Sequence, residues 1–392
     1  MSELTPEVDG THDPERHSWV QSANGPGTDF PLQNLPLGVG RTPGGKITVL
    51  TAIGDEVLDL QRVAAAGLLD ADPGLLTGAE GMGRLLARTP DELTAIRQAL
   101  VGLLERGSAA EATIRDSEGM LRPAAAVTLL TPTRIGSFTD FFAGIHHARA
   151  ASKALGRSGD LGANYRWVPI AYQSRGSTVR ASGADVRRPT GQLPGPDGAP
   201  IHAPCAMLDF ELELGIFVGN GTTVGEPVPI AQAPRHIAGF CLLNDWSARD
   251  IQRWEMTPLG PFLSKNFATT ISPWLVTPDA LRPFRVPVME RGGGDPPPLP
   301  YLWDAWDQAH GGVAIELSIW LRTADMRARD ENRALVVRSD ARYLYWTPAQ
   351  MLAHHTSGGC DLQTGGMLRA PKPVTPLWGA PVSAAVRSSV WE

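Results

Sequence analysis

Two glutamates inside an apolar, strand-like run constrain this chain more than any other feature. In LDFELELG, Glu211 and Glu213 alternate with apolar residues, and the period of two places both carboxylates on one face of a strand. Two further acids, Asp140 in SFTDFF and Asp245 in LLNDWSARD, stand far away in the sequence. Converging carboxylates repel one another unless protons or a cation lie among them, and calcium and magnesium take all-oxygen ligands. We therefore predict one divalent metal site built from three distant segments.

Each acid also has a purely structural interpretation. Glu211 and Glu213 suit the solvated face of a half-buried sheet. Asp140 and Asp245 each stand before a helix-like stretch, where an aspartate serves well as an N-cap. Residue spacing alone leaves both interpretations open.

Length and composition indicate a globular chain of two domains. At 392 residues the chain exceeds the usual size of a single core, and 42% hydrophobic against 19% charged residues is typical of folded proteins. Plentiful Pro and Gly favour an all-β or α+β chain over a helical bundle, and the fold class that we predict is α+β, mainly β. The net charge of −6 argues against a nucleic-acid partner. No apolar run approaches the roughly 18 residues that span a bilayer, so we expect no membrane partner.

The cysteines and the N-terminal segment indicate a cytoplasmic protein. Cys205, Cys241 and Cys360 are scattered without CxxC spacing, which favours reduced thiols over a disulfide framework or a zinc site. The first residues, MSELTPEVDGTHDPERHS, lack the basic start and apolar core of a secretory signal. Because this segment is polar, we expect residues 1–28 to form a flexible tail.

The rest of the chain divides into two regions of different character. In residues 29–130, apolar runs joined by Gly54-Asp55 predict a β-hairpin, and residues 60–118 predict two or three helices. In residues 131–392, short strands separated by Gly/Pro turns predict a sandwich, barrel or rolled β architecture. Helices are expected after Asp140, through SARDIQRWE and near TPAQMLAHHT.

The candidate catalytic residues lie close to the acids in the sequence. His147 follows Asp140 by seven residues, so the two share a face if that segment is helical. Imidazole titrates near neutral pH and suits a general base, although a lone histidine is more often structural. Arg249 and Gln252, three apart on a predicted helix, could hold an oxyanion together with Lys265. The alternative is a solvated helix face and a surface lysine.

From about Phe30 to about Leu368 the chain resembles the fumarylacetoacetase family. The resemblance is carried by FPLQNLPLGV with AIGDEVLDL, by SFTDFFAGIHHA, by LDFELELGIFVG and by NDWSARDIQRWEMTPLGPFLSKNFATTISPW. It implies a small N-terminal SH3-like barrel, a larger mixed β-roll catalytic domain and a homodimer. It also implies calcium with magnesium nearby, with the metal residues falling on Asp140, Glu211, Glu213, Asp245, Lys265 and Thr269.

The same resemblance implies roles for further residues. The general base falls on His147 rather than His146, and the oxyanion donors fall on Arg249, Gln252 and Lys265. Contacts to the substrate fall on Phe142, Arg157, Tyr172, Gln252 and Met256. The implied reaction is metal-dependent hydrolysis of the C–C bond of a 3,5-dioxo acid, fumarylacetoacetate, which closes tyrosine and phenylalanine catabolism. Two alternatives are a decarboxylase or hydratase of a related oxo acid, and a catalytically impaired metal-binding relative.

The chain departs from the family pattern in two places. Phe142 and Met256 stand where the family has tyrosines, so two hydroxyl donors are lost and a changed acyl group is possible. After GCDLQTGGMLRA the family continues with a Gly-Thr-Ile-Ser-Gly segment and a glutamate that orients the histidine, whereas this chain has PKPVTPLWGAPVSAAVRSSVWE. We expect the closing strands of the roll to be incomplete and activity or stability to be reduced.

Overall fold

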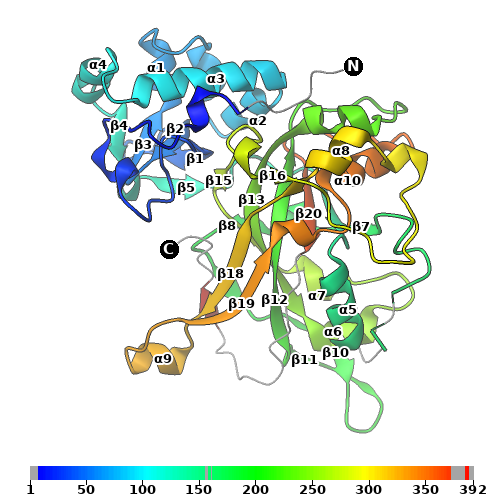
Figure 1. The fold of residues 1–392 in the computed structure, drawn as a ribbon. Helices are drawn as coiled ribbons and strands as arrows, with labels where there is room; N and C mark the ends of the chain where they lie inside the picture. The colour runs from blue at the N-terminus through cyan, green and yellow to red at the C-terminus, as the bar shows by residue number, and fades with distance from the viewer. Residues whose placement is uncertain (1–7, 155–157, 160, 372–384, 388–392) are drawn as a thin grey trace.

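A computed structural model describes residues 8–154, 158–159, 161–371 and 385–387 (Figure 1). An N-terminal part of helices over a small sheet lies at one end of a larger, sheet-rich part. The α+β, mainly β class predicted from the sequence is confirmed. Among the described helices, none combines the length and the apolar character needed to cross a bilayer.

The N-terminal sheet has six strands, one of which comes from a distant, later segment of the chain. Their order is β15-β1-β2-β3-β4, with β5 also paired to β1. The described strands form an open path rather than a closed ring, so the expected barrel is an incomplete one. The bounds are Leu37–Arg41 (β1), Ile47–Ile53 (β2), Glu56–Asp59 (β3), Leu121–Pro123 (β4), Thr128–Leu130 (β5) and Trp274–Leu275 (β15).

The predicted hairpin at Gly54-Asp55 is confirmed by the pairing of β2 with β3. Gly54 has a φ of +54°, and an added Cβ would lie 2.2 Å from Ser22 Oγ, so only glycine fits this turn. Four α-helices, rather than two or three, follow the hairpin. They are Leu60–Ala65 (α1), Gly81–Leu86 (α2), Pro90–Leu104 (α3) and Glu111–Asp116 (α4).

The expected flexible tail is wrong for residues 8–28. Trp19 and Val20 are buried in the core beneath α3, and Trp19 Nε1 donates a hydrogen bond to the Leu103 carbonyl at 2.9 Å. The polar composition of the segment concealed this apolar pair, whose burial outweighs the entropy lost on ordering the chain. Residues 1–7 lie outside the described residues.

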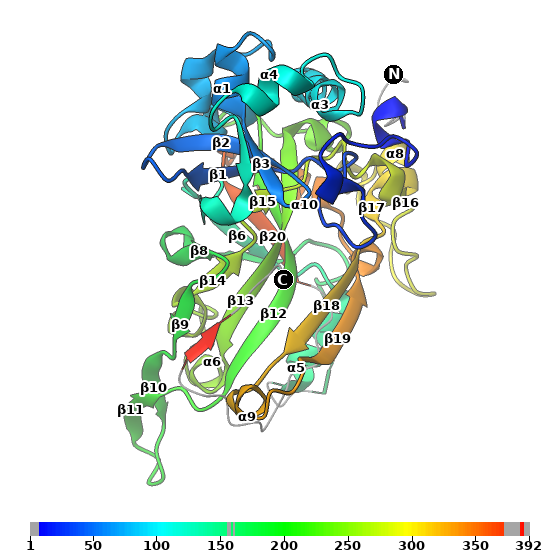
Figure 2. The same cartoon turned by 90° about the vertical axis from the view of Figure 1, so that its left-hand side faces the viewer.

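A mixed seven-stranded sheet forms the centre of the larger part (Figure 2). Its order is β7-β6-β20-β12-β13-β14-β8, with parallel pairs β20–β6 and β14–β8. The long antiparallel pair β12–β13 is its axis. The bounds are Phe138–Phe141 (β6), Ala171–Gln173 (β7), Val179–Ala181 (β8), Leu208–Val218 (β12), Ile237–Ala248 (β13), Thr269–Ile271 (β14) and Met367–Pro371 (β20).

Four two-stranded ribbons and six helices surround this sheet. The ribbons pair Asp185–Arg187 (β9) with Ala385–Arg387 (β21), Thr190–Pro194 (β10) with Pro200–Pro204 (β11), Arg285–Val286 (β16) with Gly312–Val313 (β17), and Glu316–Leu321 (β18) with Ala334–Asp340 (β19). The helices are Ile145–Ala154 (α5), Arg249–Glu255 (α6), Leu263–Asn266 (α7), Ala305–His310 (α8), Ala324–Ala328 (α9) and Pro348–Thr356 (α10).

The two parts of the chain share one core. Phe217 of β12 and Leu243 of β13 belong to the same buried apolar cluster as Leu58 and Leu100 of the N-terminal part. The division into domains at residue 130 therefore stays a prediction. The expectation of missing closing strands falls on residues 372–384 and 388–392, which lie outside the described residues, whereas β20 is fully inserted between β6 and β12.

The buried Asp307 on α8 predicts how the stability of the fold changes with pH. Its buried carboxylate accepts hydrogen bonds from Thr347 Oγ1 at 2.9 and 3.1 Å, and burial raises the pKa of Asp307 from 3.8 to about 7. The folded state therefore holds a proton that the unfolded state releases, and stability falls as pH rises from about 4 to about 7. We expect Asp307→Asn to raise the free energy of unfolding by roughly 1–3 kcal/mol near pH 8 and by less near pH 5, measured by urea unfolding. Equal gains at both pH values would contradict this.

Candidate metal centre and active site

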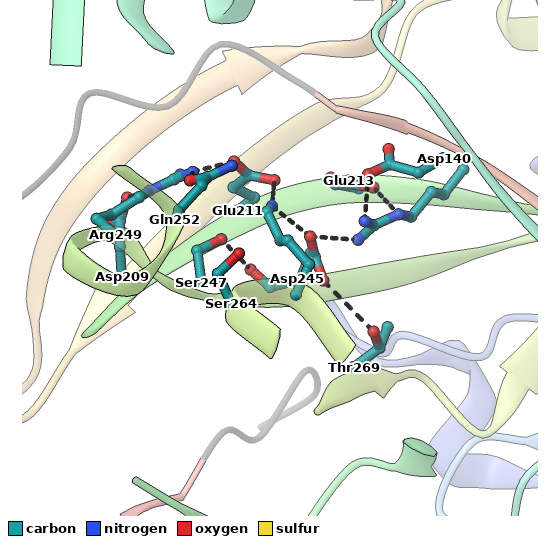
Figure 3. Close-up of polar contacts among 12 residues, drawn as sticks. Asp140, Asp209, Glu211, Glu213, Asp245, Ser247, Arg249, Gln252, Ser264 and Thr269 are labelled. Carbon is teal, nitrogen blue, oxygen red and sulfur yellow. Dashed lines mark hydrogen bonds and ion pairs between the residues drawn. The ribbon is translucent and has the colours of Figure 1, made fainter. Parts of the chain in front are cut away.

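Three buried carboxylates meet on the central pair of strands (Figure 3). Glu211 and Glu213 lie on one face of β12, and Asp245 of β13 stands directly opposite Glu211 in the strand register. One oxygen from each of the three lies within 4.8 Å of the others. Their side chains are almost completely excluded from solvent, so their mutual repulsion requires cations or protons.

The structural alternatives for these acids are wrong. Glu211 and Glu213 are 3% and 0% exposed, so they do not form a solvated sheet face. Asp245 is not an N-cap, because β13 continues to Ala248, which itself precedes α6. Asp140 is not a helix cap either, because it lies within strand β6.

Asp140 is placed differently from the prediction in one respect. Helix α5 begins only at Ile145, so Asp140 and His147 do not share a helix face. The Asp140 carboxylate is buried beside the other acids but lies outside the group of three whose oxygens converge on one point. It forms an ion pair with Arg369 Nη2 instead.

His147 faces the acids from α5. Its Nε2 lies 3.4 Å from Glu211 Oε1, and its Nδ1 has no hydrogen-bond partner among the described residues. The Phe142 ring stands edge-on to the imidazole, with 5.6 Å between ring centroids. A neutral ring that directs an Nε2 proton at Glu211 leaves Nδ1 as a proton acceptor. His146, in contrast, is exposed and stacks edge-on against Tyr343.

The predicted basic and amide donors lie against the acids rather than in solvent. Arg249 Nη2 donates to Glu211 Oε1 at 2.6 Å, and Arg249 Nη1 donates to Gln252 Oε1 at 2.9 Å. Lys265 Nζ donates to Glu211 Oε2 at 2.5 Å and also to Asp245. The shared helix face of Arg249 and Gln252 is thereby confirmed. The alternative of a surface lysine is wrong, because Lys265 is 5% exposed.

Burial and the nearby basic groups shift the pKa values of Glu211 and Glu213 in opposite directions. Burial alone would raise the pKa of Glu211, but Lys265 and Arg249 hold that pKa well below its usual value. Burial raises the pKa of Glu213 well above its usual value; Arg369 opposes this rise, and the neighbouring acids add to it. Both Glu213 oxygens lack a hydrogen-bond partner among the described residues. Glu213 is therefore the carboxylate most in need of a cation.

The remaining predicted site residues do not all lie at the buried charged cluster. Thr269 Oγ1 lies 3.4 Å from Asp245 Oδ1, and the Tyr172 hydroxyl lies 3.1 Å from Arg369 Nη2. Phe142 contacts His147, as described above, and Met256 caps the end of α6. Arg157 lies outside the described residues.

Two charged residues of the site were not predicted from the sequence. Asp209 accepts a hydrogen bond from Arg249 Nε at 2.8 Å and lies two residues before Glu211 on the same strand face. Extending the alternation of LDFELELG by one step identifies it. Arg369 carries no comparable signal, because nothing local in GGMLRA shows that its strand enters the sheet between two acidic strands.

The set of acidic side chains fits a divalent cation. Glu211, Glu213 and Asp245 supply oxygens at one point, and the two Glu213 oxygens have no hydrogen-bond partner among the described residues. If all are ionised, the buried acids exceed the buried cations by two charges, which a divalent ion would balance. The acids are Asp140, Asp209, Glu211, Glu213 and Asp245, and the cations are Arg249, Lys265 and Arg369. Arg369 also lies among these oxygens, in contact with Glu213 and Asp245.

The fold and this site define a class: an α+β protein whose buried carboxylates, histidine and basic donors form a candidate catalytic centre. Residues 33–132 match the family described as fumarylacetoacetase N-terminal, and residues 137–368 match fumarylacetoacetate (FAA) hydrolase C-terminal. The chain belongs to the fumarylacetoacetate hydrolase family.

Curated relatives and solved structures are similar to different degrees. A fumarylacetoacetase of Oryza sativa subsp. japonica is 40% identical over 379 residues, covering 92% of this chain and 83% of the relative. Those of Bos taurus and Homo sapiens are 40% and 38% identical over 356 residues, covering 87% of this chain and 80% of each relative. A maleylpyruvate hydrolase structure from Sphingobium sp. SYK-6 aligns with 90% of this chain and 91% of its own, at a TM-score of 0.45 and 18% identity, too low to bear on function.

Proposed function

We propose that this protein is a metal-dependent hydrolase that cleaves fumarylacetoacetate, a 3,5-dioxo acid, into fumarate and acetoacetate. The observation that carries the proposal is the placement of His147 against a buried acidic cluster in a chain that is 40% identical to fumarylacetoacetases over most of its length. Water, a general base, oxyanion donors and a means of stabilising a carbon leaving group are the four requirements of this reaction.

The side chains of this protein can supply the proton transfer and the oxyanion contacts. His147 Nδ1, free of other partners in the described part of the chain, accepts a proton from water, while Glu211 holds the ring through Nε2. Gln252 uses Oε1 to accept from Arg249, so its amide presents Nε2 as a donor to the oxyanion. Lys265 stays protonated because Asp245 and Glu211 outweigh its burial and raise its pKa.

A divalent cation held by Glu211, Glu213 and Asp245 would supply Lewis-acid polarisation of a chelating 1,3-dicarbonyl. We propose calcium for this site and magnesium beside Thr269, since the candidate ligand atoms are carboxylate and hydroxyl oxygens. We further propose a homodimer in the cytoplasm that acts in tyrosine and phenylalanine catabolism. Three free cysteines support a reducing compartment.

The acyl side of the substrate is proposed to be recognised differently from that of the relatives. Phe142 and Met256 provide no hydroxyl, so the Tyr172 hydroxyl is the phenolic donor that remains near the cluster. Arg157 is proposed as a further contact to a substrate carboxylate. A substrate with fewer polar groups on that side would lose less binding energy here.

A catalytically impaired metal-binding relative is the second candidate. One observation favours it: Arg369 lies among the metal-binding oxygens. Ion binding without consumption of substrate would distinguish this candidate from the hydrolase.

The chelator assay tests the proposed function. We expect the purified protein to consume fumarylacetoacetate, followed by the loss of substrate absorbance, and EDTA to lower the rate by about 100-fold or more. Added calcium should restore the rate, and EDTA already saturated with calcium is the matched control. A rate that EDTA leaves unchanged would contradict the metal requirement, and no turnover at any calcium concentration would contradict the hydrolase.

A further inference from the structure

Arg369 is a completely buried cation at the centre of the acidic cluster. Its side chain is 0% exposed, and its guanidinium group contacts three acids at once. Nη2 pairs with Asp140, Nη1 lies 2.6 Å from Asp245 Oδ2, and Nε lies 3.6 Å from Glu213 Oε2. The group thus lies among the oxygens that a divalent ion would use.

The sheet order fixes this position. Strand β20 lies between β6 and β12, and Arg369 is paired in register with Asp140 on one side and with Gly215 on the other. The ring of Phe138 lies beneath the guanidinium, 5.1 Å from its central carbon. The match to the family ends at residue 368, so Arg369 is the first residue beyond it.

We propose that Arg369 acts as a tethered cation that competes with the divalent ion for Glu213 and Asp245. The protein then keeps its acidic cluster folded without an ion, and it binds the ion weakly because the ion must displace a guanidinium group or tolerate its repulsion. The proposal rests on the proposed function only in taking this cluster as the ion site.

The buried charges around Arg369 account for both parts of the proposal. Lys265 and Arg249 neutralise Glu211, whereas Arg369 is the only basic side chain among the described residues that forms an ion pair with Glu213 or Asp140. Removing Arg369 leaves these carboxylates buried without a counter-charge, which destabilises a fold strongly. A divalent ion would then take over that role. With Arg369 present, the ion meets a positive charge at contact distance in a buried site, where water screens the repulsion little.

The test compares calcium binding and thermal unfolding in the full-length protein and in Arg369→Gln. We expect isothermal titration calorimetry to give a calcium Kd roughly 100-fold lower for Arg369→Gln than for the wild type. We also expect the Tm of wild type to be nearly the same in EDTA and in calcium, and the Tm of Arg369→Gln to rise by about 10 °C or more on adding calcium. Neither measurement uses substrate.

Two further variants keep the test decisive. Arg97→Gln removes another buried arginine, one that donates to Thr11 and to the Gln33 carbonyl far from the acids, and it should lower Tm with no dependence on calcium. Arg369→Lys keeps the charge, so its calcium Kd should stay close to that of wild type, and this variant is informative even if Arg369→Gln folds only in calcium. Equal calcium Kd values for wild type and Arg369→Gln, or no calcium binding by either, would overturn the proposal. Failure to hydrolyse fumarylacetoacetate would overturn the proposed function and leave this inference standing.

Discussion

Replacing His147 with alanine is expected to lower kcat/KM for fumarylacetoacetate by about 1000-fold. His147 is the only described histidine in contact with the acidic cluster, with Nε2 at 3.4 Å from Glu211 Oε1 and Nδ1 free of other partners. Removing the ring leaves water without a positioned base, while the oxyanion donors Arg249, Gln252 and Lys265 stay in place. The residual activity should therefore exceed that of a protein with no site at all.

His146 provides the matched control for this prediction. It is the neighbouring residue on α5, but its ring is exposed and contacts Tyr343 instead of the acids. We expect His146→Ala to keep activity within about threefold of wild type. Comparable losses in the two variants would show that the helix, and not the imidazole of His147, is needed. Circular dichroism of each variant checks that α5 remains folded.

Glu211→Gln is expected to lower the free energy of unfolding by about 3–5 kcal/mol near pH 7. Glu211 contacts several buried polar groups: it accepts hydrogen bonds from Arg249 Nη2 and from Lys265 Nζ, and it faces His147. A neutral amide would leave the two cations buried with less compensation. Guanidinium-induced unfolding in EDTA measures the change without a contribution from a bound ion.

The pH dependence of this loss has a definite sign. Lys265 and Arg249, acting against burial, hold the pKa of Glu211 well below 4.5 in the folded protein. The stabilisation from its charge is therefore complete above pH 4.5 and is lost as pH falls through the folded pKa. The difference between wild type and Glu211→Gln should shrink by about 1 kcal/mol or more near pH 3.5.

Glu105 is the matched control for Glu211. It also pairs with an arginine, Arg16, but the two side chains are 33% and 27% exposed. Solvent screens such a pair, and we expect Glu105→Gln to cost no more than about 1 kcal/mol. A loss at Glu211 no larger than at Glu105 would mean that the buried network contributes little to stability. Both carboxylates face a guanidinium group, but only Glu211 is buried and also paired with Lys265.

Local periodicity was sufficient to predict several parts of this structure. The alternation in LDFELELG placed Glu211 and Glu213 on one strand face, and the three-residue spacing placed Arg249 beside Gln252. The glycine turn between β2 and β3 was likewise predictable, since few residues adopt its backbone conformation. These features depend on residues close together in the chain.

Features set by distant segments could not be predicted in the same way. Composition suggested a flexible N-terminal segment, but Trp19 is buried because it packs against α3, which lies far away in the sequence. Spacing suggested a helix joining Asp140 to His147, whereas Asp140 belongs to a strand that pairs in parallel with β20.

The sequence by itself determined which residues could carry negative charge into the core, because a strand exposes alternate side chains whatever it pairs with. Only the tertiary structure decided which cations meet them. Arg369 is distant in sequence from all of its acidic partners, and it reaches them because β20 is inserted between β6 and β12. Strand order is a property of the whole sheet, so no local pattern encodes it.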